Sequence, residues 1–291
     1  MEIVRTAAKL RAWSRGERGK GQTVGLVPTM GALHAGHASL IEEAVRLCGR
    51  VVVSIFVNPT QFGPNEDFAR YPRNFEADCR LAEASGAQVV FAPAVEEMYP
   101  GSVEGGDGVG TFVDVEGLSG RLDGASRPGH FRGVATVVAK LLIACEADRA
   151  FFGQKDAAQV AVVRRMVRDL NLGVEVRVCA IVREADGLAM SSRNAYLSGN
   201  ERARALVLRR TLDAAERLVG EGERRAEVLR EAMLAHFFDF ADPHDEGLRL
   251  DYAEVVDAES LLPVVEVKAG DLVAVAAWVG GTRLIDNFLV R

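Results

Sequence analysis

The stretch Val24-Gly25-Leu26-Val27-Pro28-Thr29-Met30-Gly31-Ala32-Leu33-His34-Ala35-Gly36-His37 decides the fold. Its first four residues form an apolar run, which is typical of a strand buried on both faces. Residues 38–48 then repeat apolar side chains at intervals of three and four, which predicts a helix packed on a sheet. The stretch is therefore predicted to form a strand, a turn that carries His34 and His37, and the start of a helix.

A turn between a strand and a helix presents backbone N–H groups and the positive end of a helix dipole at one point, which suits phosphate. His34 and His37 lie three residues apart and share a helix face. An imidazole there can donate to, or protonate, an oxygen that gains charge as a phosphate ester breaks. The alternative is that each histidine only caps or packs. The pair, with Gly31 and Gly36 leaving room for a ligand, favours a phosphate site.

The composition is that of an ordinary globular protein. The chain has 291 residues, of which 48% are hydrophobic and 26% charged, and this length usually divides into two domains. The net charge of −6 argues against broad binding to nucleic acid or anionic membranes. The four cysteines lack CxxC spacing, which favours buried reduced thiols over disulfides or a zinc site. With no apolar leader and no ~20-residue apolar run, we expect a cytoplasmic protein.

Strand-like and helical patterns alternate through the first two thirds of the chain. Apolar runs rich in β-branched residues are typical of buried strands, and they occur at 24–27, 50–57, 87–93, 150–152 and 174–181. Around them, apolar side chains follow helical spacing at 5–15, 38–48, 74–85, 134–144 and 157–169. This βαβ rhythm predicts an α/β fold with a doubly wound, Rossmann-like parallel sheet, which we assign to a domain of residues 1–181.

The sequence after residue 181 has a different organisation. Ser198 and Glu201 form the capping box of a helix that is predicted to reach residue 219, and a second helix follows at 224–238. Strands are predicted at 248–256, 272–279 and 283–289, with Gly280-Gly281 as the hairpin turn between the last two. Residues 182–291 are therefore predicted to form a smaller C-terminal α+β domain.

Polar residues follow three more of the predicted elements. Gln61 lies in the turn-rich segment 58–64, at the carboxyl edge where open α/β sheets bind ligands. Lys155 lies between a strand and a helix, so a second cation-bearing turn points to the same edge and suits a phosphate. Ser191, Ser192 and Arg193 supply two hydroxyls and a guanidinium in a row.

The alternatives for these residues are structural. Asn58 and Gln61 would cap turns, Lys155 would pair with Asp156 at the surface, and a serine would cap a hairpin. We favour capping for Asn58 and ligand binding for the others, because the histidine turn is predicted at the same edge of the sheet.

A glycine-rich segment extends from residue 100 to residue 133 and includes a strand-like piece at 111–115. Long segments of this kind are usually functional lids or disordered. Arg127, His130 and Arg132 make its end locally basic, which favours a lid over a polyphosphate; the alternative is a solvated surface.

Six motifs occur together along the chain: PTMGALH at 28–34 with His37, FVNPTQF at 56–62, YPR at 71–73 followed by Asp78, RPGHFRGV at 127–134, FGQKD at 152–156 and READGLAMSSRN at 183–194. An HxGH motif alone would indicate only a wide superfamily that includes class I aminoacyl-tRNA synthetases. The full set, which covers the chain nearly end to end, resembles the pantothenate synthetase family, the AMP-forming pantoate:beta-alanine ligases.

The resemblance implies a fold of the HxGH nucleotidyltransferase type and a reaction in two steps, on the route to coenzyme A. The carboxylate of pantoate attacks the α-phosphate of ATP, which gives pantoyl adenylate and pyrophosphate. The amine of beta-alanine then displaces AMP to give pantothenate. It also implies that magnesium accompanies ATP, that the enzyme is a homodimer, and that the C-terminal domain covers the active site.

The resemblance also implies roles for individual residues. The implied catalytic residues are His34, His37, Lys155 and Arg193. The implied ATP contacts are Met30, Gly31, Ala32, Leu33, His34, Ala35, Gly36, His37, Gly153, Gln154, Lys155, Asp156, Val182, Met190, Ser191, Ser192 and Arg193. Gln61 and Gln159 would bind pantoate, with Gln61 also near beta-alanine, and Asp78 would help to place magnesium through water.

Two other functions compete with this one. A different HxGH-type adenylyltransferase, acting on a phosphate ester, would share the histidines and the serine–arginine segment but has no evident need for Gln61 and Gln159. A nucleotide-binding module without activity would not explain three phosphate-type turns in one chain.

Overall fold

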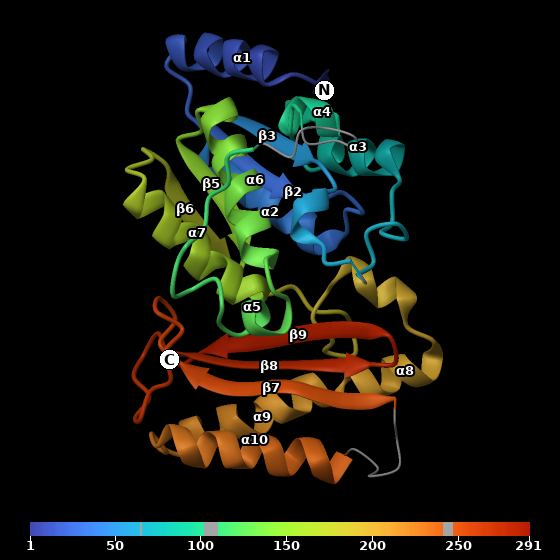
Figure 1. Ribbon diagram of the computed structural model, residues 1–291, viewed down its shortest axis with the longest axis vertical. Helices are drawn as coiled ribbons and strands as arrows, with labels where there is room; N and C mark the ends of the chain where they lie inside the picture. Colours follow the sequence, from blue (N-terminus) through green and yellow to red (C-terminus); the bar gives the residue numbers. More distant parts are fainter. Residues whose placement is uncertain (65, 102–109, 241–246) are drawn as a thin grey trace. The chain divides into compact units, whose positions relative to one another are not determined.

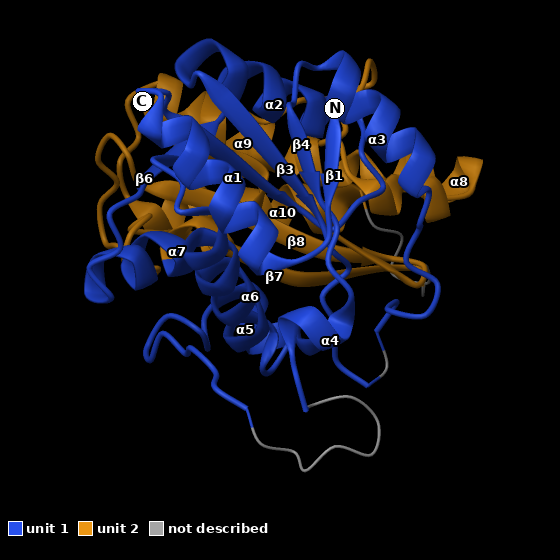
Figure 2. Ribbon diagram, turned by 90° about the horizontal axis from the view of Figure 1, so that it is seen from above, with its two compact units in different colours: residues 1–153, 162–179 blue, residues 154–161, 180–291 orange. Residues whose placement is uncertain are grey.

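The computed structural model describes residues 1–64, 66–101, 110–240 and 247–291 (Figure 1). The chain divides into two compact units, coloured separately in Figure 2: residues 1–153 with 162–179, and residues 154–161 with 180–291. The division into two domains between residues 181 and 182 stays a prediction. By its contacts, the short segment 154–161 groups with the second unit.

The first unit contains a six-stranded parallel sheet with the strand order β1-β4-β3-β2-β5-β6. The two central strands are buried on both faces, since the valines and leucine of β2 and the valines of β3 are fully buried. The strands are β1 Glu2–Val4, β2 Val24–Thr29, β3 Arg50–Ile55, β4 Val89–Phe91, β5 Arg149–Gly153 and β6 Glu175–Cys179. This sheet confirms the predicted doubly wound α/β fold.

Helices cover both faces of this sheet (Figure 2). α1 (Ala7–Gly19) and α6 (His130–Cys145) contact each other and β2, whereas α2 (Ala35–Leu47) and α3 (Phe75–Ala84) contact each other on the opposite face. The remaining elements are short or link the units: α4 Val95–Met98, α5 Asp123–Ser126, α7 Ala157–Asp169, and the 3-10 turns η1 Pro59–Gln61 and η2 Gln154–Asp156.

The second unit is an antiparallel sheet covered by helices, as predicted. Its strands pair in the order β7 (Leu248–Val256), β8 (Leu272–Val279) and β9 (Thr282–Leu289), and Gly280-Gly281 turns the chain between the last two. α9 (Val207–Gly220) and α10 (Ala226–Phe240) pack against the sheet around a core that includes Leu212, Met233 and Val275. The other elements are η3 Ser192–Tyr196 and α8 Gly199–Ala205.

Four element predictions need correction. Residues 111–115 form no strand; the Val113 N–H donates instead to Thr136 Oγ1 of α6 (2.9 Å). The helix predicted from residue 134 begins at His130. The Ser198–Glu201 capping box is confirmed, but the helix that it begins is interrupted at Leu206. Strand β1 was missed because three residues are too few to show a periodic pattern.

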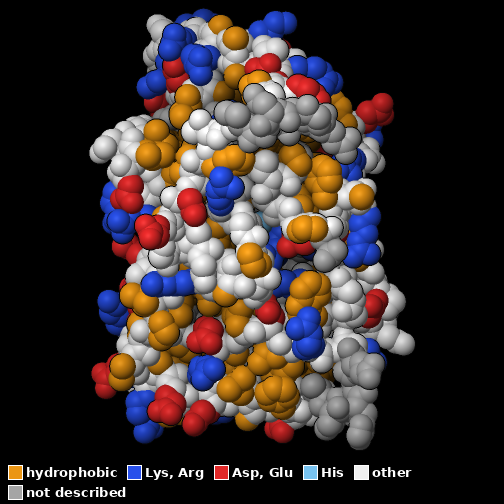
Figure 3. Space-filling model, in the orientation of Figure 1, with side chains coloured by type: hydrophobic (Ala, Val, Ile, Leu, Met, Phe, Trp, Pro, Cys, Tyr) orange, Lys and Arg blue, Asp and Glu red, His pale blue; other side chains and the backbone are white. Residues whose placement is uncertain are grey.

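The surface and the thiols agree with an ordinary globular protein. On the face seen in Figure 3, basic and acidic side chains are interspersed rather than gathered by sign. All four cysteines are free thiols, and burial raises the pKa of Cys145 to about 12. In the part of the chain that the structure describes, every helix is too short or too polar to span a lipid bilayer.

Candidate active site

His34 and His37 cap the helix that they begin. His34 is the N-cap residue of α2, and its Nδ1 accepts a hydrogen bond from the Gly36 N–H (3.1 Å). His37 Nδ1 accepts from the His34 N–H (3.3 Å), and the two ring centroids lie 4.1 Å apart. Because Nδ1 accepts in both rings, the proton of each neutral imidazole lies on Nε2. The capping alternative is therefore confirmed, and it makes Nε2–H the donor that each ring can offer to a ligand.

Asp78 of α3 fixes the turn that precedes the histidines. The backbone is left-handed at Gly31 (φ 86°) and at Ala32 (φ 51°), where the conformation is unfavourable for alanine. The buried Asp78 carboxylate accepts from the N–H groups of Ala32 (2.9 Å) and Leu33 (2.7 Å). The prediction that this turn presents its backbone N–H groups to phosphate is therefore wrong for these two donors, which a carboxylate already engages.

Asp78 does not fit the role of placing magnesium that the resemblance implies. Both of its oxygens accept backbone hydrogen bonds, and the residue is only 3% exposed. Magnesium in phosphate sites usually keeps several waters beside one or two carboxylates, which needs a solvated carboxylate. Among the residues that the structure describes, no group of three or more His, Cys, Asp or Glu side chains could hold a metal ion. The carboxylate is better explained as the partner of the turn.

Asn58 orients Gln61, which follows β3, the strand next to β2 in the sheet. Asn58 is almost completely buried and caps η1, as predicted. It also donates from Nδ2 to Gln61 Oε1 (3.1 Å) and to the Gly133 carbonyl (3.2 Å), and it accepts from the Tyr99 hydroxyl (2.7 Å). Gln61 Nε2 in turn donates to Met30 Sδ (2.8 Å). The structure thus places the Gln61 amide beside the histidine turn.

Arg127 and His130 fix the Gln61 backbone. Arg127 forms a two-point ion pair with Glu66 (2.7 and 2.5 Å). The His130 ring lies between Arg127 Nη1 (3.0 Å) and the Gln61 carbonyl (2.9 Å). Burial acts to raise the pKa of Glu66, but the hydrogen bond and charge of Arg127 outweigh it and lower that pKa below its usual value. The guanidinium is therefore paired with a charged carboxylate at neutral pH.

The prediction of a basic lid over a polyphosphate is not supported by these contacts. Arg127 and His130 bind neighbours within their own unit, and the Arg132 guanidinium lies 3.8 Å from the centroid of the Phe112 ring. Part of the predicted lid, residues 102–109, lies outside the described residues. The basic residues of this segment act on the turn that carries Gln61.

The close approach of α6 to this turn predicts a large effect of a single methyl group. A Cβ at Gly133 would lie 2.3 Å from the Thr60 carbonyl oxygen and 2.7 Å from the Gln61 Cα. Because both neighbours are backbone atoms, we expect Gly133→Ala to lower the free energy of unfolding by ~1–3 kcal/mol, as overpacking does. Urea denaturation measures this change.

Gly16 supplies the matched control for that substitution. It is also a helical glycine, in α1, but a Cβ there would meet no atom within 4 Å. We expect Gly16→Ala to raise the free energy of unfolding by ~0.5–1 kcal/mol, because alanine favours helix. Equal tolerance of both substitutions would contradict the assigned contact.

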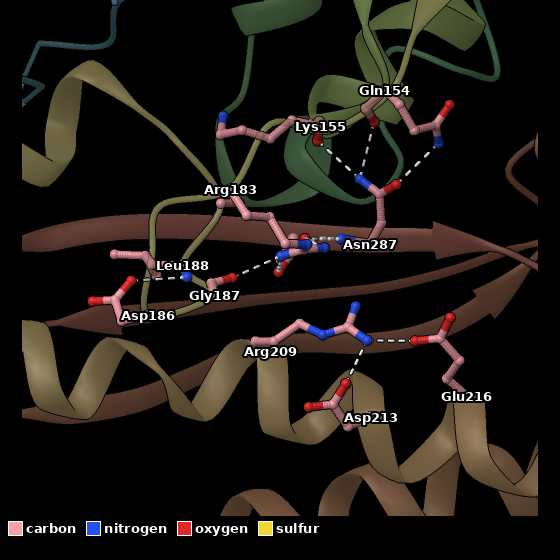
Figure 4. A network of polar contacts seen from close by, with 12 residues as sticks. Gln154, Lys155, Arg183, Asp186, Gly187, Leu188, Arg209, Asp213, Glu216 and Asn287 are labelled. Atoms are coloured by element: carbon pink, nitrogen blue, oxygen red, sulfur yellow. Dashed lines mark hydrogen bonds and ion pairs between the residues drawn. The ribbon is translucent and has the colours of Figure 1, made fainter. Parts of the chain in front are cut away.

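In the second unit, Lys155 lies in η2 with its backbone fixed by β9 (Figure 4). Its ammonium lies 3.2 Å from Asp156 Oδ1, so the alternative pairing with Asp156 is present. The lysine side chain is only 19% exposed, however, and is not an ordinary surface lysine. Gln159 follows one turn later in α7 and is half-buried.

The segment around Ser191 forms hydrogen bonds among its own residues within the second unit. The Met190 N–H donates to the Val182 carbonyl (2.9 Å), which joins two of the predicted ATP contacts. Ser191 caps η3, and its Oγ accepts from the Arg193 N–H (3.3 Å). The capping alternative is therefore confirmed for Ser191.

Asp286 and Asn287 of β9 are functional candidates that the sequence patterns did not indicate. Each is 3% exposed, and Asn287 contacts the backbone of Gln154 and Lys155. A signal was present, because these two polar residues stand between the apolar pairs Leu284-Ile285 and Phe288-Leu289. Polar groups buried in a sheet need hydrogen-bond partners, so they point to a network.

The predicted site residues therefore form two sets. In the first unit, the structure brings together Met30, the histidine turn, Gln61 and Asp78. In the second unit, two segments contact adjacent residues of β9. The η2 turn contacts Asn287, and the segment from Val182 to Arg193 contacts Asp286 through Arg183.

Comparisons with known proteins agree along the whole chain. Residues 2–289 match the family described as pantoate-beta-alanine ligase. The pantothenate synthetase of Koribacter versatilis is 54% identical over 291 residues, which cover 100% of this chain and 96% of that protein. The crystal structure of pantothenate synthetase from Thermus thermophilus has a TM-score of 0.89 and 46% identity, and the match covers 100% of this chain and 99% of that one.

A solved relative with ligands is also similar. The pantoate-beta-alanine ligase of Francisella tularensis, complexed with beta-gamma ATP and beta-alanine, has a TM-score of 0.76 and 32% identity, with 99% of this chain and 97% of that chain covered. These matches run over essentially the full length of both partners. The chain therefore belongs to the pantoate-beta-alanine ligase family.

Proposed function

We propose that this chain is an ATP-dependent ligase that joins pantoate to beta-alanine through an amide bond and so forms pantothenate. The observation that carries the proposal is the contact of Gln61 with Met30 beside the two-histidine turn, in a chain of this family. An amide suited to a hydroxy acid then contacts the turn that leads to the imidazole donors suited to phosphate. The ligands of the Francisella tularensis relative support ATP and beta-alanine as ligands here.

The first step forms pantoyl adenylate. A carboxylate oxygen of pantoate bonds to the α-phosphorus of ATP, and the bond from that phosphorus to the β-bridging oxygen breaks, so that pyrophosphate leaves with the electron pair. Such transfers depend mainly on alignment and on neutralisation of developing charge. We assign the Nε2–H groups of His34 and His37, and the positive charges of Lys155 and Arg193, to that neutralisation.

The second step forms the amide. The amine of beta-alanine attacks the carbonyl carbon of the adenylate, AMP leaves, and the nitrogen loses a proton. We assign Gln61 and Gln159 to pantoate and residues 30–37, 153–156, 182 and 190–193 to ATP. Magnesium would accompany the phosphates of ATP, and no step is assigned to it here.

The resemblance to the family also supports a homodimer in the cytoplasm, which we propose on that ground. Sedimentation of the purified chain tests the dimer: a monomer at micromolar concentration would contradict it.

Pyrophosphate release from ATP by the purified protein tests the proposed function. Release should require pantoate, and AMP with pantothenate should appear only when beta-alanine is added as well. If pantoate does not stimulate release, the proposal fails. An adenylyltransferase that acts on a phosphate ester would instead release pyrophosphate with the ester and form an AMP-linked product without free AMP.

A further inference from the structure

Asn287 of β9 uses its whole amide to bind the turn that carries Lys155 (Figure 4). Its Nδ2 donates to the carbonyls of Gln154 (3.1 Å) and Lys155 (2.9 Å), and its Oδ1 accepts from Gln154 Nε2 (3.0 Å). Asn287 is only 3% exposed, so water cannot readily replace these bonds. The Lys155 backbone is therefore fixed by a side chain that lies 132 residues away in the sequence.

The preceding residue of the same strand binds a second segment. The buried Asp286 carboxylate pairs with both terminal nitrogens of Arg183 (2.6 and 3.0 Å). Arg183 Nη1 also donates to the Gly187 carbonyl (3.1 Å) and so ties the loop between Val182 and Met190. The Asn287 N–H donates to Asp286 Oδ1 (2.8 Å), which links the two partners.

Hydrogen bonds from a buried side chain to the backbone of a turn fix the position of the charged side chain that the turn carries. A buried carbonyl that loses its donor costs ~1–3 kcal/mol, so the η2 turn would rearrange rather than leave two carbonyls unpaired. A misplacement of ~1 Å at a reacting centre can lower a rate ~10²-fold.

We propose that Asp286 and Asn287 are positioning residues: Asn287 sets Lys155, and Asp286 sets the segment from Val182 to Arg193 through Arg183. This inference rests on the proposed function, in which both segments contact ATP. The two residues act on ATP through their neighbours and are not themselves catalytic.

Asn287→Ala tests the first half of the inference. We expect kcat to fall ~10²-fold, while the KM values for pantoate and beta-alanine stay within about twofold of wild type. In a Lys155→Ala background the same substitution should change kcat less than about threefold, because the side chain that it positions is absent; a merely structural loss would persist there. Wild-type kinetics for Asn287→Ala, or full additivity with Lys155→Ala, would overturn the inference.

Asp286→Asn tests the second half against a matched control. Asp251 of β7 forms a similar ion pair with Arg283 of β9 (2.9 and 2.7 Å), and this pair joins two strands of the antiparallel sheet. We expect Asp286→Asn to raise the KM for ATP ~10-fold, on the scale of a positional loss, and Asp251→Asn to leave it unchanged. Equal KM values for the two variants would overturn this half.

Failure of the proposed function can be distinguished from failure of the positioning roles of Asp286 and Asn287. Wild-type protein that forms no pantothenate contradicts the proposed function. Wild-type protein that forms pantothenate, beside an equally active Asn287→Ala variant with a normal unfolding temperature, contradicts only the inference. Calorimetric titration with α,β-methylene-ATP gives a readout without turnover: Asn287→Ala should bind it ~10-fold more weakly, and unchanged binding together with unchanged kcat would refute the positioning role.

Discussion

Replacing His37 with asparagine is expected to lower kcat by ~10²-fold, the scale of losing one donor to developing charge. The asparagine Oδ1 lies close to the position of the histidine Nδ1, so it can still accept from the His34 N–H and preserve the start of α2. The Nε2–H donor is lost. Steady-state pyrophosphate release measures kcat, and a thermal unfolding temperature near that of wild type verifies that the cap survives.

Glutamine at the same position separates hydrogen bonding from proton transfer. Its amide nitrogen reaches the position of the histidine Nε2 and can donate, but it cannot give up a proton near neutral pH. We expect His37→Gln to retain clearly more activity than His37→Asn, because pyrophosphate is a good leaving group and needs a donor more than an acid. Equal loss in both variants would show that His37 transfers a proton.

Asp78→Asn is expected to reduce both stability and turnover. The carboxylate accepts from two N–H groups of a left-handed turn, and an amide can replace only one of its oxygens. The second backbone N–H then faces the NH2 group of the asparagine and loses its acceptor. We therefore expect a loss of ~1–3 kcal/mol in the free energy of unfolding. Because the turn leads directly into the histidine cap, kcat should fall as well, which the same assay measures.

Asp148 and magnesium provide the controls for this prediction. Asp148 accepts from the Val24 N–H (2.8 Å) at the opposite end of β2, so Asp148→Asn should cost stability without changing kcat. Raising the magnesium concentration should not restore Asp78→Asn if the carboxylate fixes the turn. Recovery of activity in high magnesium would instead favour a role in placing the metal.

The sequence allowed most of the fold to be predicted because the central strands and their helices carry strong periodic patterns. The strand-turn-helix unit at 24–47 was correct for this reason, as were the three C-terminal strands. The partner of the N–H groups in the turn could not be predicted. That partner is Asp78, which lies 46 residues from Ala32 in the sequence. Hydrogen-bond partners at such separations leave no trace in local periodicity.

The candidate site shows the same limit. Local chemistry correctly singled out Gln61 and Lys155 as residues beside turns, and it correctly named capping as a role of Ser191. The local charge of Arg127 led to a wrong interpretation of this residue. Its partner Glu66 lies 61 residues away in the sequence, and the carboxylate neutralises the charge of the guanidinium. The support of Lys155 by Asn287 depends equally on the tertiary fold.

The two-histidine cap has a consequence for protein design. Serine or aspartate at the position of His34 would begin a helix at least as well as histidine does. A procedure that optimised folding stability alone would therefore replace His34 and gain a more robust scaffold, while discarding the imidazole assigned to phosphate. Thermostable variants of this chain are best sought elsewhere on its surface, with residues 30–37 kept unchanged.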